Sequence, residues 1–319
     1  MNLQKKFYDD LIWSLRERPK TINDIILPVS LKVKFSNMVD NDNIPNMILY
    51  GPSGTGKTTV AAILSEMTGR DTFYINGNKD SSIDILRGEL TKFVSSCSFG
   101  ESNKKIVIID EADAKGRNAM LQGALKSFIE EFSKSASFIF ITNFINLMDK
   151  ELVSRLQQID FSFSQTEQVE LKKQFAKVVL DILNKENIKY DKKVLGFLVK
   201  KYFPDMRKCL NEIQNLGQQD KLKDPSVINE FGGDIDNFYE YLKSRDFNAI
   251  QLFMSNISDS QSFYSKIYET CKLYIEPNDI PSVIILTNEY AYKSQFVIDQ
   301  RINLVAFACE LMNNVKIKD

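Results

Sequence analysis

The chain has 319 residues, enough for about two or three domains, and 43% of them are hydrophobic, so it can bury sizeable cores. Lys and Arg number 41 against 42 Asp and Glu, which argues against a protein that binds nucleic acid through a global basic surplus. Histidine is absent, and this excludes active sites that need a histidine base and metal sites that need imidazole ligands.

Four cysteines are spread along the chain, and no two of them form a C-x-x-C pair. They are Cys97, Cys209, Cys271 and Cys309. This spacing predicts neither a zinc ribbon nor a disulfide framework and is typical of a reducing compartment. The opening segment contains the acidic pair Asp9-Asp10 and no small-residue cleavage site, so we expect no signal peptide. No apolar stretch reaches the roughly 18 residues of a membrane span, so we also expect no membrane contact.

Strands and helices alternate in the first part of the predicted structure. Short apolar or β-branched runs predict strands over residues 46–50, 72–75, 106–109 and 138–142. Helical spacing of apolar residues predicts helices over residues 57–68, 83–97 and 119–132. This alternation indicates an α/β fold, with a parallel sheet covered by helices on both faces.

The rest of the chain is expected to be helical. Ser164 and Glu167 fit a capping box at the start of a helix, and an apolar stripe follows them. A polar loop over residues 217–225 and the pair Gly232-Gly233 mark breaks before an aromatic-rich helical region. We therefore predict three domains, which cover residues 1–163, 164–230 and 231–319. The aromatic residues of the third domain are expected in its core and at subunit contacts, because they follow helical spacing without interleaved basic residues.

Residues 51–58 read Gly-Pro-Ser-Gly-Thr-Gly-Lys-Thr and match the phosphate-binding motif G-x-x-x-x-G-K-[ST] at every fixed position. The motif lies between a predicted strand and a predicted helix, so backbone N–H groups and the helix N-terminus can surround a phosphate chain. Lys57 is expected to reach the β- and γ-phosphates, and the Thr58 hydroxyl is expected to bind Mg²⁺. The residues predicted to bind nucleotide here are Gly51, Pro52, Ser53, Gly54, Thr55, Gly56, Lys57, Thr58 and Thr59.

An acidic pair follows the strand predicted over Ile106–Ile109. The strand would carry Asp110 and Glu111 to the carboxyl edge of the sheet, where doubly wound folds bind their ligands. Asp110 is expected to hold Mg²⁺, directly or through water, and Glu111 to orient and polarise the attacking water. With Lys57, these carboxylates predict hydrolysis of ATP rather than nucleotide binding alone. Phosphoryl transfer depends on positioning and charge neutralisation, so the lack of histidine is no obstacle.

Several further segments carry a resemblance to a known family. They are Glu17–Ile22 (ERPKTI), Asp110–Asp113 (DEAD), Thr142-Asn143, Ser154–Leu156 (SRL) and Pro204–Lys208 (PDMRK). Together with the phosphate-binding loop, they make the chain similar to the AAA+ ATPases and, within them, to the clamp-loader ATPase subunits. The resemblance covers residues 15–215 strongly, whereas over residues 231–319 only length and helicity agree.

The resemblance implies roles for four residues outside the phosphate-binding loop and the acidic pair. Arg18 would lie beside the adenine pocket, and Asn143 would act as the first sensor, in contact with the γ-phosphate or the attacking water. Arg155 would act in trans on the ATP of a neighbouring subunit, and Arg207 would contact the nucleotide from a helical lid. Leu156 replaces the usual cysteine of the S-R-C motif, which leaves the charge of Arg155 in place.

Within this family the chain is most similar to the large subunit of T4-like phage clamp loaders, through Ile25–Pro28, Leu86–Gly88 and its length. The three predicted domains would then be an AAA+ P-loop domain, a small helical lid and an all-α collar for oligomerisation. The resemblance directs Arg87 toward duplex phosphates, and Gln122 would couple the DNA-binding face to the ATP site. Three other charged residues near Arg87 could join it, or all four could be solvated surface charges. They are Lys79, Lys115 and Arg117.

The resemblance implies an ATPase subunit of a clamp loader, which opens a sliding clamp and loads it onto primer-template DNA. DNA-triggered ATP hydrolysis would release the loaded clamp. The implied partners are the clamp, the phosphate backbone of primer-template DNA without sequence preference, and a smaller clamp-loader subunit. Four copies of this chain would assemble with one small subunit. The expected setting is the cytoplasm of a bacterial host, with a phage as the source.

Two alternatives are left open by the residues themselves. The chain could be another AAA+ motor on DNA, such as a helicase loader or a branch-migration ATPase. It could also be a scaffold subunit that binds ATP without hydrolysing it, although the complete set of Lys57, Thr58, Asp110, Glu111 and Arg155 argues against that.

Overall fold

The computed structural model describes residues 11–77, 83–96, 104–113, 118–225, 227–228, 235–257 and 259–318, without the side chains of residues 83–87, 118–121 and 124. The chain divides into two compact units. The first consists of Met1–Ile188 with Leu198–Gln218, and the second of Lys189–Phe197 with Gln219–Asp319. Among the described helices, none is both long and apolar enough to cross a membrane.

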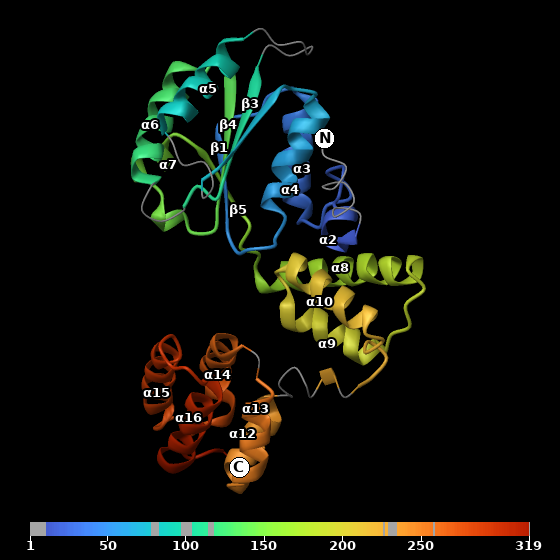
Figure 1. Cartoon of the computed structure of the whole chain (residues 1–319), viewed down its shortest axis with the longest axis vertical. Helices are drawn as coiled ribbons and strands as arrows, with labels where there is room; N and C mark the ends of the chain where they lie inside the picture. Colours follow the sequence, from blue (N-terminus) through green and yellow to red (C-terminus); the bar gives the residue numbers. More distant parts are fainter. Residues whose placement is uncertain are drawn as a thin grey trace. The chain divides into compact units, whose positions relative to one another are not determined.

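A five-stranded sheet in the order β2-β3-β4-β1-β5 forms the centre of the first unit, and all its pairings are parallel (Figure 1). The strands are β1 (Met47–Tyr50), β2 (Thr72–Asn76), β3 (Lys105–Asp110), β4 (Ala136–Thr142) and β5 (Gln157–Asp160). The four predicted strands are confirmed. The β5 strand was not predicted, because its sequence QQID is polar and three of its four residues are exposed.

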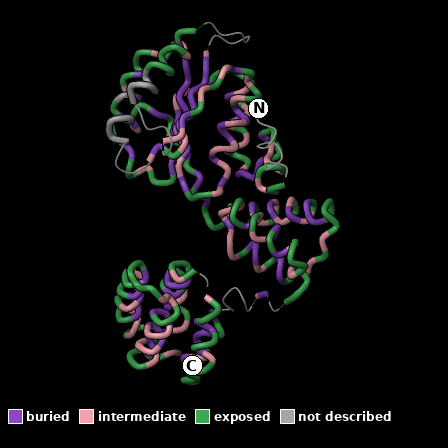
Figure 2. Tube along the Cα trace, in the orientation of Figure 1, coloured by how far each residue is buried: buried purple, intermediate pink, exposed green. Residues whose placement is uncertain are grey.

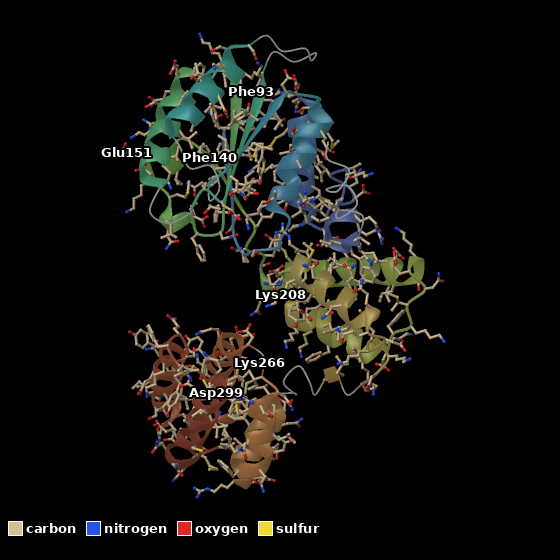
Figure 3. The ribbon with its side chains drawn as sticks, in the orientation of Figure 1. Phe93, Phe140, Glu151, Lys208, Lys266 and Asp299 are labelled. Atoms are coloured by element: carbon tan, nitrogen blue, oxygen red, sulfur yellow. The ribbon has the colours of Figure 1, made fainter. Side chains whose placement is uncertain are left out.

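Helices cover both faces of this sheet, with α3 (Val29–Asp40) and α4 (Lys57–Thr68) on one side. On the other side lie α5 (Ile83–Ser95), α6 (Asn118–Glu131) and α7 (Lys150–Ser154). Apolar strand residues such as Val107 and Phe140 pack with Leu125 and Leu152 of these helices in one core (Figures 2 and 3). Strands buried on both faces are expected of a parallel sheet between two helical layers, so the predicted fold class is confirmed.

The first unit also contains helices that precede or follow the five strands in the chain. These are the short α2 (Trp13–Arg16), the long α8 (Gln165–Lys185) and α10 (Met206–Gln218). The Ser164 side chain accepts a hydrogen bond from the Glu167 backbone N–H, and the Glu167 side chain accepts one from the Ser164 N–H, so the predicted capping box is confirmed. Helix α9 (Lys192–Tyr202) is divided between the two units.

Five helices make up most of the second unit. They are α12 (Ile235–Ser244), α13 (Phe247–Ser255), α14 (Ser260–Tyr274), α15 (Ile280–Lys293) and α16 (Gln300–Asn314). The rings of Phe238, Phe253 and Phe263 are buried in their shared core, as predicted for the aromatics of this region. Tyr292 and Phe296 are exposed instead, with 64% and 68% of their surfaces accessible.

Candidate functional site

The phosphate-binding loop connects β1 to α4 through three glycines with positive φ, and the first of them, Gly51, has a φ of 133°. Gly54 has a φ of 70° and Gly56 a φ of 97°, and Gly56 is the N-cap of α4. A Cβ on Gly54 would overlap the Asp205 carboxylate, because the Met206 N–H donates to the Gly54 carbonyl at 3.2 Å. The start of α10 therefore lies directly against the loop, and a side chain at Gly54 would separate them.

Lys57 is buried at the first turn of α4, with 5% of its surface exposed. Its Nζ donates to the carbonyl oxygens of Gly51 and Pro52, both at 2.7 Å, and to Asn143 Oδ1 at 3.0 Å. Burial lowers the pKa of the ammonium group to about 8, although the Asp110 carboxylate opposes this change. The structure thus joins two predicted site residues, Lys57 and Asn143, that lie far apart in the sequence.

The Asp110 carboxylate lies at the end of β3 and accepts three hydrogen bonds. Its Oδ2 accepts from the Thr58 hydroxyl at 3.0 Å and from the Tyr74 hydroxyl at 2.7 Å. Its Oδ1 accepts from the Glu111 backbone N–H at 2.9 Å. Glu111 itself has a φ of 55°, a left-handed conformation that is costly for a residue with a side chain and is often found at functional sites. The structure thus brings together Thr58 and Asp110, the two residues that were each expected to hold Mg²⁺.

Tyr74 was not among the predicted site residues. Its ring lies on β2, and desolvation together with the hydrogen bond to Asp110 raises the pKa of the phenol above its ordinary value. The protonated phenol therefore donates to the carboxylate. The sequence alone gives little indication that Tyr74 reaches Asp110. The contact depends on the register between β2 and β3, which pairs Asn76 with Asp110 and places Tyr74, two residues earlier, on the same face of the sheet.

The loop after β4 is held by the last residue of the acidic box. Asp113 Oδ2 accepts hydrogen bonds from the backbone N–H groups of Asn143, at 3.0 Å, and Phe144, at 2.9 Å. Asp113 thus has a structural role in this loop. The carboxylate fixes the backbone from which the Asn143 side chain reaches Lys57.

Gln122 on α6 is buried and connects the acidic box to the helix that carries Arg155. Its Nε2 donates to the Ala112 carbonyl at 3.2 Å, and its Oε1 accepts from the Asp149 N–H at 2.7 Å. Asp149 is the N-cap of α7, and Arg155 is the C-cap of the same helix. These two hydrogen bonds connect Gln122 to the acidic box and to α7. Its expected role in coupling the DNA-binding face to the ATP site stays a prediction.

Arg155 is the C-cap residue of α7. Its guanidinium forms an ion pair with Glu130 of α6 at 2.7 Å and is about one-third exposed. Arg155 is not among the described residues that line the cavity of its own chain. Its action in trans stays a prediction.

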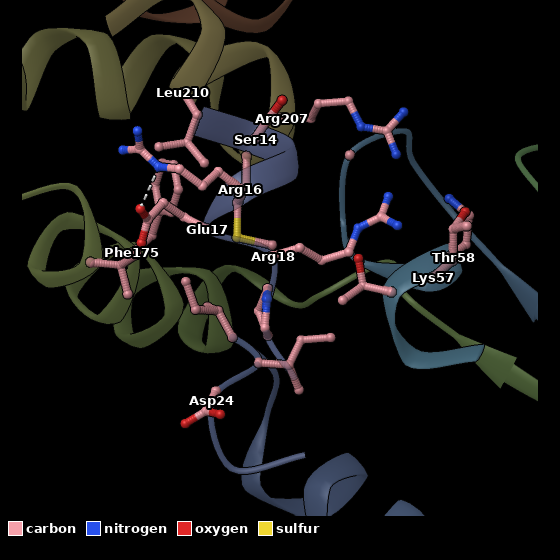
Figure 4. Close-up of a pocket in the computed structure, with 18 of the residues that line it drawn as sticks. Ser14, Arg16, Glu17, Arg18, Asp24, Lys57, Thr58, Phe175, Arg207 and Leu210 are labelled. Carbon is pink, nitrogen blue, oxygen red and sulfur yellow. Dashed lines mark hydrogen bonds and ion pairs between the residues drawn. The ribbon is translucent and has the colours of Figure 1, made fainter. Parts of the chain in front are cut away.

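A cavity of about 720 Å³ opens over the phosphate-binding loop (Figure 4). Most predicted nucleotide and catalytic residues line it. These are Arg18, Ser53, Gly54, Gly56, Lys57, Thr58, Thr59, Asp110, Glu111, Asn143 and Arg207. Gly51, Pro52 and Thr55 were also predicted to bind nucleotide but are not among the residues that line the cavity. The carbonyls of Gly51 and Pro52 accept hydrogen bonds from Lys57. The buried Thr55 donates its hydroxyl to the Pro52 carbonyl at 2.9 Å.

The far end of the cavity contains residues that the sequence did not point to individually. They are Ser14, Arg16 and Glu17 before the predicted Arg18, and Phe175, Val178, Asp181, Ile182, Lys185, Met206 and Leu210 of α8 and α10. Figure 4 shows Phe175 and Leu210 on the side away from Lys57 and Thr58, with Arg18 and Arg207 extending toward the loop. The apolar stripe predicted on α8 was the available signal, since Phe175 and Ile182 belong to it.

The described side chains fit Mg²⁺ at one end of this cavity. Thr58 and Asp110 present oxygen ligands 3.0 Å from one another. No group of three or more His, Cys, Asp or Glu residues that could hold a metal is found in the described part of the chain. A magnesium ion that takes one or two protein oxygens and completes its shell with phosphates and water needs no such group.

The predicted DNA-contacting residues cannot be placed in this site. Lys79, Lys115 and Arg117 lie outside the described residues, and so does the side chain of Arg87, whose backbone belongs to α5. Their contact with DNA stays a prediction.

The chain is similar to known proteins over most of its length. Residues 47–163 match the ATPase family associated with various cellular activities, and residues 167–228 match the lid domain of the sliding-clamp-loader large subunit. The sliding-clamp-loader large subunit of Enterobacteria phage T4 is 34% identical over 92% of this chain and 94% of that protein. The corresponding subunit of Escherichia phage RB69 is 32% identical over 82% of each chain.

More distant proteins share the fold. A probable replication factor C subunit 5 of Dictyostelium discoideum is 27% identical over 89% of this chain and 84% of that protein. A solved variant of Thermotoga maritima RuvB covers 80% of this chain and 79% of its own with a TM-score of 0.50, at 16% identity, and this likeness shows the fold alone. The P-loop geometry and the two phage relatives together show that this chain is an ATP-hydrolysing AAA+ ATPase of the sliding-clamp-loader large-subunit family.

Proposed function

We propose that the chain is the ATP-driven subunit of a clamp loader that opens a sliding clamp and places it on primer-template DNA. The convergence of Lys57, Thr58, Asp110, Glu111 and Asn143 at one end of the cavity carries the proposal. That end has the charges that phosphoryl transfer needs, and the lid helices α8 and α10 line the other end. An ATP held between them would favour one arrangement of loop and lid over others.

Each residue at the phosphate end has a distinct proposed task. Lys57 would turn from the Gly51 and Pro52 carbonyls to the β- and γ-phosphates, while Asn143 holds the amine and meets the γ-phosphate or the water. Thr58 and Asp110 would hold Mg²⁺, which neutralises phosphate charge when bound. Glu111 would accept a proton from the attacking water.

Arg155 is proposed to act on the ATP of a neighbouring copy of the chain. Arg155 is the C-cap of α7 and is not among the described residues that line the cavity of its own chain, which supports this role. An arginine supplied in trans stabilises the charge of the transition state and can accelerate hydrolysis by about 10³- to 10⁵-fold. Arg18 and Arg207 would contact nucleotide in the same chain, since both line the cavity.

The proposed partners follow from the two phage relatives, which are named as sliding-clamp-loader large subunits. They are a sliding clamp, a smaller subunit and further copies of this chain, in a ratio of four copies to one small subunit. Arg87, Lys79, Lys115 and Arg117 are proposed to follow the phosphates of primer-template DNA, with binding that weakens as salt rises. DNA contact would trigger hydrolysis and release the clamp, in the cytoplasm of a bacterial host.

We also propose that the chain is divided into three domains. Residues 1–163 would form the AAA+ domain, residues 164–230 the lid and residues 231–319 the collar. The match of residues 167–228 to the clamp-loader lid supports the two inner boundaries. The exposed Tyr292 and Phe296 of the second unit are proposed to lie at contacts between subunits.

The first test measures ATP hydrolysis by the purified chain at low salt, with and without primer-template DNA. We expect DNA to raise the rate, and Glu111→Gln and Arg155→Ala each to abolish the increase. If DNA leaves the wild-type rate unchanged, the small subunit and a clamp are added. A rate that is still insensitive to DNA contradicts DNA-triggered hydrolysis.

Mixing the two inactive variants tests action in trans. In a mixed ring, the cavity of an Arg155→Ala subunit has an intact Glu111 and can receive Arg155 from a Glu111→Gln neighbour. We therefore expect an equal mixture to recover activity at about a quarter of its sites, as random assembly predicts. If Arg155 acted within its own chain, no mixture would recover activity.

A further inference from the structure

Tyr74 contacts the acidic end of the site from the edge of the sheet. Strand β2 is the outer neighbour of β3, and the Tyr74 ring is 51% exposed. Its hydroxyl nevertheless reaches inward and donates to Asp110 Oδ2 at 2.7 Å. This hydrogen bond is shorter than the 3.0 Å bond that Thr58 donates to the same oxygen.

The strand register fixes this contact. Asn76 is paired with Asp110 and Tyr74 with Ile108, so Tyr74, Asn76 and Asp110 share one face of the sheet. The side chain of Asn76 lies near the Tyr74 hydroxyl. The Gly77 N–H donates to the Asp110 carbonyl at 2.9 Å, so β2 holds Asp110 by its backbone and by its side chain.

The two hydroxyl donors to Asp110 have different tasks. Thr58 belongs to the phosphate-binding loop, and its oxygen is itself a proposed ligand of Mg²⁺. Tyr74 belongs to a strand and is not among the residues that line the cavity in the described part of the chain. Its hydroxyl can therefore hold the carboxylate whether or not Thr58 turns to the metal.

We propose that Tyr74 is a positioning residue that orients the Asp110 carboxylate for Mg²⁺. The inference rests on the proposed role of Asp110 as a magnesium ligand. Groups that hydrogen-bond to metal-binding carboxylates set the affinity of a site, and their loss typically weakens metal binding by about 10- to 100-fold. Tyr74 is half exposed, so water can replace part of the lost hydrogen bond, and the effect belongs at the lower end of this range.

The test replaces Tyr74 by Phe, which keeps the ring and removes only the hydroxyl. A fluorescent ADP analogue is titrated onto the full chain, first without Mg²⁺ in EDTA and then at increasing Mg²⁺ concentrations. We expect the Mg²⁺ concentration for half-maximal enhancement of binding to rise about tenfold. The affinity in EDTA and the midpoint of thermal unfolding should stay at the wild-type values. A Mg²⁺ dependence equal to that of the wild type would overturn the proposal.

Tyr50→Phe is the matched control. Tyr50 lies on β1 of the same sheet, and its hydroxyl is close to the Asp160 carboxylate. The change therefore removes a phenol hydroxyl beside a carboxylate on a strand that does not neighbour β3. We expect its Mg²⁺ dependence to equal that of the wild type. An equal shift in both variants would mean that loss of any phenol–carboxylate pair disturbs the sheet, and it would refute a specific role of Tyr74.

An Asp110→Asn background separates this inference from the proposed function. If Asp110→Asn raises the Mg²⁺ requirement and Tyr74→Phe adds nothing in that background, the two residues act as one unit. If Tyr74→Phe causes its full shift without the Asp110 carboxylate, the positioning role is wrong although the magnesium role of Asp110 stands. If Asp110→Asn leaves the Mg²⁺ requirement unchanged, both the assignment of Asp110 and the inference fail.

Discussion

The two ends of the cavity are built in different ways. At the phosphate end, the functional side chains follow directly after β1, β3 and β4, whose carboxyl ends meet at one edge of the parallel sheet. At the far end, residues that precede Arg18 line the cavity together with residues of α8 and α10, which come after the whole sheet in the chain. The Trp13 N–H, for example, donates a hydrogen bond to Gln214 Oε1, which lies 201 residues later. One end is therefore set by strand register and the other by packing of distant segments.

The chemistry of the two ends differs in the same way. The phosphate end consists of charged and polar groups held by hydrogen bonds of 2.7 to 3.0 Å around the buried Lys57. The far end combines apolar side chains such as Leu210 with the ion pairs of Glu17 with Arg16 and Lys185, which are partly exposed and so weakly stabilising. We expect changes at the first end to reduce catalysis and changes at the second to reduce affinity alone.

Glu111→Gln is expected to have the largest effect. The substitution keeps the size of the side chain and removes the base, so hydrolysis should fall by about 10²- to 10⁴-fold. Nucleotide affinity should change by less than about twofold, because phosphate contacts are made elsewhere. Steady-state hydrolysis and binding of a fluorescent nucleotide measure the two quantities. Glu131→Gln on the exposed side of α6 is the control, and equal activity of Glu111→Gln and wild type would remove Glu111 from the mechanism.

Gly54→Ala tests the point where the two ends touch. The new Cβ would meet the Asp205 carboxylate at a backbone φ of 70°, and such strain costs about 1 to 3 kcal/mol. Loop and lid would separate, so nucleotide binding, measured by fluorescence titration, should weaken by about ten- to a hundredfold.

Gly69→Ala is its control. Gly69 has a φ of 60° at the end of α4, and open space surrounds its Cβ position, so this variant should lose stability but keep its affinity. Equal affinities of the Gly54→Ala and wild-type proteins would show that the loop does not depend on the contact with Asp205.

The same contrast explains how much the sequence could predict. The P-loop and the acidic pair were predicted because local motifs and strand ends specify them, whereas Asn143 was predicted through the resemblance. The structure brings the Lys57 amine to Asn143 Oδ1 and close to the Asp110 carboxylate. Tyr74 was missed because its role depends on the register between β2 and β3. The β5 strand was missed because its polar residues give no apolar run, and only its pairing with β1 makes it a strand.

The far end could be predicted only through the resemblance, which placed Arg18 and Arg207 near the nucleotide. Leu210 and Phe175 have helical spacing that is equally consistent with an ordinary core, and Phe175 is in fact 1% exposed. Which face of α8 and α10 borders a cavity depends on contacts with α2, such as the hydrogen bond from the Trp13 N–H to Gln214 Oε1. A local sequence pattern cannot predict contacts between residues about 200 positions apart in the chain.

The pH dependence of binding tests the burial of Lys57. Its pKa of about 8 means that the amine loses its proton as the pH rises from 7 to 9, whereas bound phosphates need the charged form. Affinity for a fluorescent ATP analogue should therefore weaken by about tenfold over this range, with proton uptake on binding at the higher pH. The last ionisation of the phosphate is centred near pH 6 and adds little. A Lys57→Arg variant should bind with no such dependence, and a flat wild-type profile would contradict the lowered pKa.

Leu210→Ala is expected to have the smallest effect and to appear in affinity alone. Leu210 lines the far end of the cavity and is half-buried, so truncation removes apolar contact worth about 1 kcal/mol, or about fivefold in nucleotide affinity. The maximal rate of hydrolysis should be unchanged, because the groups around the phosphates stay in place. Val169→Ala on α8 removes an exposed side chain from the same lid and should alter neither quantity. A lower maximal rate with unchanged affinity would mean that the lid helices set the geometry of the phosphate end, and that the two ends are one mechanical unit.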